Sequence, residues 1–303
     1  MPHPFNLLVI LGATASGKTT LGVQIATQLD GEIISADSRQ VFRGMDLGTG
    51  KDLEEYGEIP YHLIDILAAG AEFSVFDFQK RCYNAIETIR QHGQLPLLVG
   101  GTGLYLDAVL RGYRMVEVPE NPLLRAELAH LNDAALAARL TTLRPQQHNR
   151  TDLEDRQRLI RAIEIALGEA EAAATLPPPP PISPTIFGLR WPRPLLHQRI
   201  SHRLKQRLKA GMIAEVEALH ASGVSWKQLD NYGLEYRFIS RHLQGELNLN
   251  DMTQQLASAI RQFAKRQETW FRRMEKQGTT IHWLDGEKDP FAQLQHHLER
   301  LAS

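Results

Sequence analysis

The chain has 303 residues, of which 43% are hydrophobic and 23% charged, with 22 glycines and 16 prolines. This composition is typical of a soluble globular protein and excludes disordered, collagen-like and small disulfide-rich chains. Its 34 Lys and Arg residues nearly balance 35 Asp and Glu residues, and the net charge is -1. Such a balance argues against a nucleic-acid partner, but it does not report where the charges lie.

The one cysteine, Cys82, cannot form an internal disulfide, so we expect a reducing compartment and a core position for this residue. The apolar run at the N-terminus extends only from Leu7 to Leu11, too short for a secretory signal. No later stretch approaches the roughly 20 apolar residues of a membrane-spanning helix. We therefore expect a cytoplasmic protein without membrane contact.

The first part of the chain alternates between strand and helix patterns. Apolar segments at 6–11, 32–35 and 95–99 predict buried strands, and helical spacing predicts helices over about 17–29 and 75–91. Strand, helix, strand, helix, strand is the pattern of a parallel α/β sheet.

The second part is mostly helical. A Leu-, Ala- and Arg-rich segment from about 121 to 171 has no strand candidates and precedes five prolines, 177–181, which predict an extended spacer. After them we expect a strand at 185–189, helices at about 194–209, 213–222 and 251–277, a strand at 280–284 and a helix from 290. This order predicts a core of residues 1–112 and 183–303 with a helical insertion at 113–182.

A phosphate-binding pattern, G-x-x-x-x-G-K-[ST], lies between the first strand and the first helix. Its residues are Gly12, Ala13, Thr14, Ala15, Ser16, Gly17, Lys18 and Thr19. The glycines allow the backbone to wrap around an anion, so that N–H groups point at phosphate oxygens. Lys18 adds positive charge, and Thr19 offers a hydroxyl to a Mg²⁺ ion. The motif predicts an α/β fold with a P-loop NTPase-like parallel sheet core.

The strand at 95–99 is followed by Gly100, Gly101 and Thr102, not by the acidic residue that phosphate-loop hydrolases place there. The first carboxylate at a strand end is Asp37. Because the ends of parallel strands meet at one crevice, Asp37, Thr102 and the phosphate loop should lie close together. This set suits diphosphate binding beside a proton acceptor, although Asp37 could equally cap the next segment and Thr102 could satisfy a tight turn.

Six segments in fixed order closely resemble the tRNA dimethylallyltransferases, also called tRNA isopentenyltransferases: GATASGKT, ISADSRQVFRGMDLGTGK, IPYHLIDI, LPLLVGGTGLYLDAVL, DRQRLIRAIEI and IRQFAKRQETWFRR. The resemblance extends from about Leu8 to Arg273. It implies transfer of the dimethylallyl group from dimethylallyl diphosphate to N6 of the adenosine just 3′ of a tRNA anticodon, with release of diphosphate.

The resemblance also implies roles for particular residues. Asp37 would be the general base toward adenine N6. Charge on the departing diphosphate would be stabilised by Lys18, Thr102, Arg203 and a Mg²⁺ ion held through Thr19, with Arg199 as the second choice after Arg203. The residues expected to contact tRNA are Asp37, Ser38, Arg39, Gln40, Gln157, Arg158, Arg161, Arg261, Lys265 and Arg266. Taken from sequence alone, the arginines could also be solvated helix charges.

The chain departs from the family pattern in places. Gly50 stands where alanine is usual, Asp52 follows Lys51 where a proline is common, and Glu235 stands where the family has a lysine. The insertion is also shortened. None of these departures falls in the phosphate loop, at Asp37 or at Thr102.

Positive charge is concentrated in the C-terminal half, in the segments 190–209 and 261–276. Clustered arginines and lysines with interleaved aromatic residues suit RNA binding, although the aromatics fit a protein core equally well. This basic half argues against the main alternative, an adenylate isopentenyltransferase that acts on free AMP, ADP or ATP. A phosphate-loop small-molecule kinase and a non-catalytic RNA-binding switch are the remaining alternatives. We expect a monomer that binds tRNA, dimethylallyl diphosphate and Mg²⁺.

Overall fold

The computed structural model describes residues 5–144, 156–172 and 178–302. Contacts divide the chain into two compact units, one formed by residues 1–111 and 181–303 and the other by residues 112–180. Within the described residues, the first unit contains a six-stranded parallel sheet of order β3-β2-β4-β1-β5-β6. Its strands are β1 (Leu7–Gly12), β2 (Gly31–Ala36), β3 (Tyr61–His62), β4 (Leu95–Gly100), β5 (Pro184–Arg190) and β6 (His282–Asp285).

The parallel register brings several strand ends to one edge of the sheet. Ala36 of β2 and Leu11 of β1 are both paired with Gly100 of β4, and Gly12 is paired with Leu189 of β5. The loops that follow β1, β2, β4 and β5 therefore leave the sheet at the same edge. This edge is where ligands bind in open α/β sheets.

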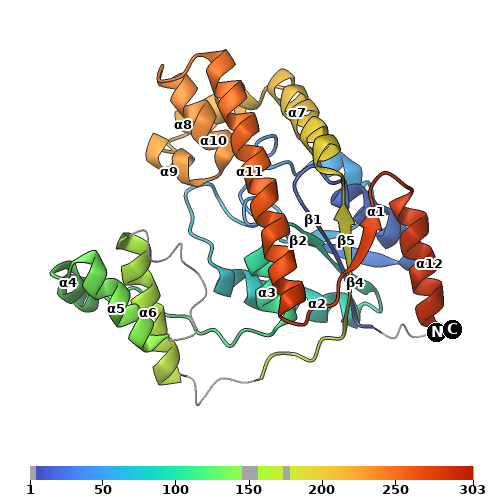
Figure 1. Ribbon diagram of the computed structural model, residues 1–303, viewed down its shortest axis with the longest axis horizontal. Helices are drawn as coiled ribbons and strands as arrows, with labels where there is room; N and C mark the ends of the chain where they lie inside the picture. Colours follow the sequence, from blue (N-terminus) through green and yellow to red (C-terminus); the bar gives the residue numbers. More distant parts are fainter. Residues whose placement is uncertain (1–4, 145–155, 173–177, 303) are drawn as a thin grey trace. The chain divides into compact units, whose positions relative to one another are not determined.

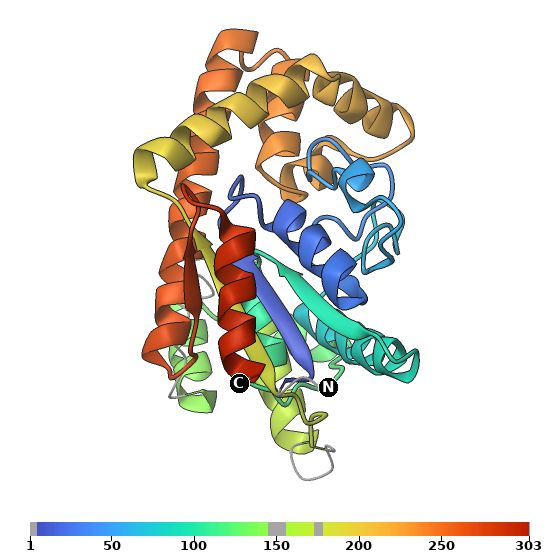
Figure 2. The ribbon, with the colours of Figure 1, turned by 90° about the vertical axis from the view of Figure 1, so that its right-hand side faces the viewer.

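Helices cover both faces of the sheet (Figures 1 and 2). One face packs on α2 (Val75–Gln91), α3 (Gly103–Leu110) and the end of α11 (Leu249–Lys276), and the other on α1 (Lys18–Leu29) and α12 (Pro290–Ala302). All six residues of β1 are buried because alternate side chains enter these two cores. Cys82 of α2 is fully buried, which confirms its expected core position.

A third core forms above the strand ends. It joins α7 (Arg193–Lys209), α8 (Met212–Ala221), α9 (Trp226–Asn231), α10 (Leu234–Leu243) and the first half of α11 to the loops that follow β1 and β2. Ala13 and Ala15 of the phosphate loop and Met45 of the β2 loop are buried in it. The C-terminal helices thus form a wall over the edge where the sheet's loops converge.

The parallel α/β sheet is confirmed, and the predicted strands and long helices lie within a few residues of their expected ends. The short elements were missed: α3, α9, α10, the two-residue β3 and the 3₁₀ turn η1 (Leu53–Tyr56). They carry too few residues for a clear hydrophobic period. Residues 178–183 form neither helix nor strand, while Leu176 and Pro177 lie outside the described residues. No helix of the described chain combines the length and apolar character that crossing a membrane requires.

The second unit contains α4 (Pro122–Ala129), α5 (Asp133–Leu143) and α6 (Arg156–Ala172), packed around a cluster of leucines and isoleucines. Asn121 and Asn132 cap α4 and α5, so the segment expected to be helical from about 121 to 171 consists of separate helices. The Glu164 side chain is 1% exposed and pairs with Arg125 at 2.9 Å and Arg161 at 3.1 Å. The backbone N–H of Asn121 donates to the same carboxylate at 2.9 Å.

This network makes the stability of the second unit pH-dependent. Burial alone would raise the pKa of Glu164, but the bonds from Arg125, Asn121 and Arg161 outweigh it and lower the pKa from 4.5 to about 2. Because the folded-state pKa is depressed, the carboxylate stabilises the fold above pH 4.5, and this contribution is lost as the pH falls toward 2. Its size is about 3 kcal/mol at pH 7.

We therefore expect Glu164→Gln to lower the thermal midpoint of this unit at pH 7 and to differ much less from the wild type at pH 3. Scanning calorimetry at both pH values measures the difference. Glu169→Gln is the control, since Glu169 is 26% exposed in its pair with Arg144 and such pairs contribute at most about 1 kcal/mol. An equal loss at both pH values for Glu164→Gln would contradict the assignment.

Candidate active site

The phosphate loop joins β1 to α1 and has the backbone of an anion-binding turn. Gly17 adopts a φ of 95°, a conformation that favours glycine and turns successive N–H groups toward one side. A Cβ atom on Gly12 would lie 2.6 Å from Ser16 Oγ, so the start of the loop also requires glycine. The two outer glycines of the motif therefore have separate structural reasons.

Side chains from two C-terminal helices, α7 and α11, form hydrogen bonds with the phosphate loop. Gln267 of α11 accepts a hydrogen bond from the Thr14 N–H at 2.8 Å, and Arg203 of α7 donates to Thr14 Oγ1. Arg199 donates from Nε to the Ala15 carbonyl at 2.9 Å. Because the Thr14 N–H is already bonded to Gln267, Thr14 faces the adjacent cavity without a free backbone N–H.

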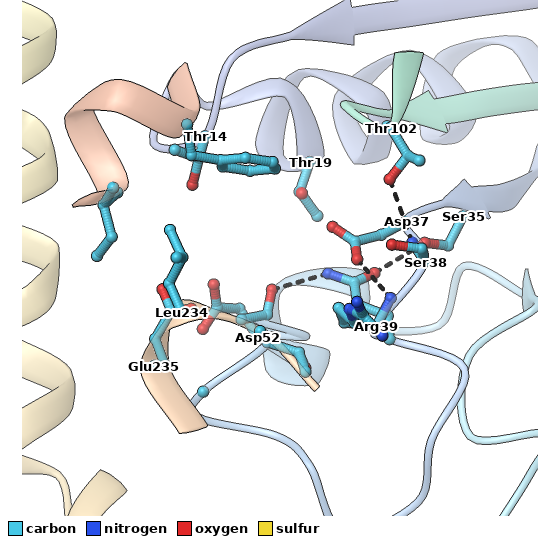
Figure 3. Close-up of a pocket in the computed structure, with 18 of the residues that line it drawn as sticks. Thr14, Thr19, Ser35, Asp37, Ser38, Arg39, Asp52, Thr102, Leu234 and Glu235 are labelled. Carbon is cyan, nitrogen blue, oxygen red and sulfur yellow. Dashed lines mark hydrogen bonds between the residues drawn. The ribbon is translucent and has the colours of Figure 1, made fainter. Parts of the chain in front are cut away.

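A cavity of about 230 Å³ lies where the loops converge. It brings together nine of the residues singled out from the sequence: Thr14, Lys18, Thr19, Asp37, Ser38, Arg39, Gln40, Thr102 and Arg203. Figure 3 shows Asp37 and Thr102 on one wall, Leu234 and Glu235 on the opposite wall, and Thr19 projecting between them. Arg203 lines this cavity, whereas Arg199 lies outside it with its guanidinium 4.1 Å from the Trp191 ring.

Asp37 and Thr102 each accept a structural hydrogen bond from a loop N–H and also line the cavity. Asp37 Oδ1 accepts the Arg39 N–H at 2.8 Å, which orders its own turn while the carboxylate still faces the cavity. Thr102 Oγ1 accepts the Ser38 N–H at 3.2 Å and so joins the β4 loop to the β2 loop. Gln40 uses its amide within the protein, accepting from Ser35 Oγ and donating to the Gly50 carbonyl.

The cavity holds several cations that are partly or fully withdrawn from solvent, Lys18, Arg203 and Arg207. Burial, followed by the charge of Arg203, lowers the pKa of Lys18 to about 8. Burial and the neighbouring Arg207 lower the pKa of Arg203 to about 10. Cations whose charged forms are disfavoured in the free protein are stabilised when an anion binds among them. These groups therefore suit a ligand with multiple negative charges.

Among the lining residues that sequence reasoning did not assign to the site are four with charged or amide side chains: Asp52, Arg207, Glu235 and Gln267. Arg207 pairs with Asp52 at 2.7 Å, and Gln267 Nε2 donates to the Gly101 carbonyl at 2.9 Å. Burial raises the pKa of Glu235, which the charges of Arg203 and Arg207 partly offset. In the sequence, Arg207 is one of several basic residues in the segment 190–209, and Gln267 is one residue of a segment that resembles the family. Neither had a feature that assigned it to the site.

The departure at Gly50 has a structural reason. Gly50 has a φ of 68°, and a Cβ atom there would lie 2.2 Å from the Arg207 guanidinium. An alanine would be strained and would displace Arg207 from its pair with Asp52. The preceding loop is also held from the C-terminal half, because Glu215 accepts the N–H groups of Asp46, Leu47 and Gly48.

The structure separates the basic residues by environment. Arg203 and Arg207 enter the cavity, and Arg261 donates to Ser201 Oγ at 2.9 Å, whereas Lys265 and Arg266 are exposed on α11. Of the neighbouring aromatics, Phe271 is buried and Phe263 is 38% exposed at the cavity.

The three residues singled out in the second unit also differ in environment. Gln157 and Arg158 are exposed on α6. Arg161 is instead bound within its own unit, where it donates to Glu164 and to the Val118 carbonyl.

Comparison with known proteins identifies the family. The family model described as IPP transferase matches residues 40–274. The tRNA dimethylallyltransferase 2 of Syntrophotalea carbinolica is 66% identical over 94% of this chain and 96% of that protein. The tRNA dimethylallyltransferase 1 of Geotalea daltonii is 62% identical over 95% of this chain and 94% of that protein.

A solved structure agrees with these relatives. The crystal structure of the full-length tRNA isopentenylpyrophosphate transferase of Bacillus halodurans has a TM-score of 0.71 and 32% identity, over 98% of this chain and 95% of that chain. The shared fold, the near-complete coverage and the matching family model lead to one conclusion: the chain belongs to the IPP transferase family, whose curated members are named tRNA dimethylallyltransferases.

Proposed function

We propose that the protein transfers the dimethylallyl group of dimethylallyl diphosphate to N6 of the adenosine just 3′ of a tRNA anticodon and releases diphosphate. The observation that carries this proposal is one cavity lined by Lys18 of the phosphate loop, by Arg203 and by the carboxylate of Asp37. The family names of the relatives support the same activity.

Asp37 is the general base of this proposal. Adenine N6 is a weak nucleophile and must lose a proton as its bond to the prenyl carbon forms. Arg39 holds Asp37 Oδ1 through its backbone N–H, which leaves Oδ2 for the N6 proton. The C–O bond of the donor breaks, its electron pair leaves with the diphosphate, and Asp37 takes the proton.

The remaining residues of the cavity suit the donor. Lys18 and Arg203 stabilise the charge that grows on the departing diphosphate oxygen, and Thr102 can donate its hydroxyl proton to the same group. Leu234, Ile260 and Phe263 line the cavity and offer an apolar wall for the five-carbon chain.

A Mg²⁺ ion fits this site through few protein ligands. Thr19 presents a hydroxyl oxygen, a ligand type that Mg²⁺ accepts, and the described residues contain no cluster of three His, Cys, Asp or Glu that could hold a metal alone. Thr19 and the diphosphate oxygens would hold the ion together. When bound, it would neutralise charge on the diphosphate.

The exposed residues of the two helical regions are our candidates for tRNA contact: Gln157 and Arg158 on α6, and Lys265 and Arg266 on α11. Arginine and lysine at these positions can pair with backbone phosphates, which orient the RNA without reading its sequence. We further propose that the protein acts as a monomer.

Nucleoside analysis tests the function. The purified protein is incubated with unmodified tRNA, dimethylallyl diphosphate and Mg²⁺, and the digested nucleosides are analysed by mass spectrometry. We expect adenosine that carries one five-carbon isoprenyl unit, from tRNA alone. Prenylation of AMP but not of tRNA would instead establish the adenylate isopentenyltransferase, and phosphate transfer from ATP would establish a kinase.

A further inference from the structure

A second cavity, of about 290 Å³, lies on the other side of the phosphate loop. The active-site cavity uses the loops after β1, β2 and β4, whereas this one lies between the loop after β1, the end of β5 and Trp283 of β6. We call it the rear pocket; its lining residues are Ala13, Ser16, Leu189, Arg190, Trp191, Arg193, Leu196, Glu268, Phe271, Arg272 and Trp283. It shares no lining residue with the active-site cavity.

The rear pocket carries more positive than negative charge, with three arginines against the one carboxylate of Glu268. Arg190 ends β5, Arg193 begins α7 and Arg272 lies on α11, and all three are exposed. Within the described chain, none of these guanidinium groups forms an ion pair with a carboxylate. Arg190 is held with its guanidinium 4.0 Å from the Trp283 ring, which orients it in advance. Three arginines without an ion pair in the described residues, one of them oriented by an aromatic ring, suit a phosphate group.

The pocket also contacts the phosphate loop from behind. Ser16 is 1% exposed, and its hydroxyl has no hydrogen-bond partner in the described chain. The Trp191 indole N–H donates to the Ser16 carbonyl at 2.8 Å, so the loop and the pocket wall are directly bonded. Leu189, Leu196 and Phe271 supply an apolar floor of the kind that buries a flat ring.

The carboxylate of Glu268 favours a ligand that carries hydrogen-bond donors as well as phosphates. Its carboxylate makes no hydrogen bond within the described chain, even though Arg272 follows it by four residues on α11. An inorganic or prenyl diphosphate has no donor for a carboxylate and would be repelled by it. A nucleoside phosphate has phosphates for the arginines, a base for the apolar floor, and ribose hydroxyls or an amino group for Glu268.

We propose that the rear pocket binds a nucleoside phosphate, either free or as a nucleotide of RNA. The volume is close to the lower limit of small-molecule sites, roughly 300 Å³, which fits one nucleotide. This inference goes beyond the proposed function and does not depend on it, because the test below requires no turnover.

Binding of ADP to the Lys18→Ala protein tests the proposal, because this change weakens the phosphate loop and leaves the rear pocket intact. We expect ADP to bind with one site in equilibrium dialysis and to quench the fluorescence of Trp283. Adding Arg193→Ala or Arg272→Ala should raise the Kd by about tenfold each. Glu268→Ala should weaken the binding of ADP but strengthen the binding of inorganic diphosphate, which the carboxylate no longer repels.

Two controls separate these effects from general loss of charge or fold. Lys276→Ala removes an exposed cation from the same helix outside the pocket and should leave the Kd for ADP unchanged. Trp283→Phe should reduce the quench, with Trp191 as the remaining tryptophan of the pocket, while dialysis still detects ADP. Displacement of ADP by a tRNA anticodon stem-loop would assign the site to an RNA nucleotide, and its persistence would assign it to a free one. Absence of ADP binding to the Lys18→Ala protein, or an unchanged Kd in both arginine variants, would overturn the proposal.

Discussion

Asp37→Asn is expected to lower kcat for tRNA prenylation by about 10² to 10⁴, the usual contribution of a general base. The asparagine oxygen can still accept the Arg39 N–H that Asp37 Oδ1 accepts at 2.8 Å, so the turn should keep its geometry. What is lost is the group that takes the N6 proton. The Kd for tRNA should therefore stay within about threefold of the wild type, since one neutral hydrogen bond contributes little to a large RNA interface.

Single-turnover assays with saturating tRNA and donor measure this effect. Asp52→Asn is the matched control, because Asp52 is a second carboxylate of the same cavity but is paired with Arg207 at 2.7 Å. Asp37→Ala should lose as much turnover as Asp37→Asn. Near-normal turnover in either Asp37 variant would remove this residue as the base.

Gln267→Leu is expected to lower kcat by about 10², the loss that a misplacement of roughly 1 Å produces between reacting groups. Gln267 is 7% exposed and joins the Thr14 N–H of the phosphate loop to the Gly101 carbonyl beside Thr102. Leucine keeps the size of the side chain but leaves both backbone groups without their partner. The phosphate loop would then shift relative to the β4 loop, whose Thr102 accepts the Ser38 N–H beside the base.

Gln267→Glu separates the two bonds, because a carboxylate still accepts the Thr14 N–H but cannot donate to Gly101. We expect an intermediate kcat and a Kd for inorganic diphosphate close to the wild type, whereas Gln267→Leu should weaken diphosphate binding as well. Gln79→Leu is the control for simple loss of a buried amide, since Gln79 is 6% exposed and donates to the Ala108 carbonyl away from the cavity. Equal kcat losses in the Gln79 and Gln267 variants would show that Gln267 has no positioning role.

The sequence by itself determined the features that depend on neighbours in the chain. The phosphate loop could be identified because its glycines and Lys18 act within eight consecutive residues, between a buried strand and a helix. The placement of Asp37 and Thr102 in one cavity followed from a simple rule, since strand ends of a parallel sheet meet at one edge. The charge pattern likewise located the basic C-terminal half despite the net charge of -1.

Only the tertiary structure decided which members of the basic half serve the cavity. Arg203 and Arg207 lie one helical turn apart on α7 and face inward, whereas Arg190 lies against Trp283 in the rear pocket. Gln267 reaches Thr14 across 253 positions of sequence, and Gly50 is explained only by the guanidinium packed against it. Such contacts arise from the packing of distant helices, and no local period or motif records them, because hydrophobic patterns report burial and not the partner.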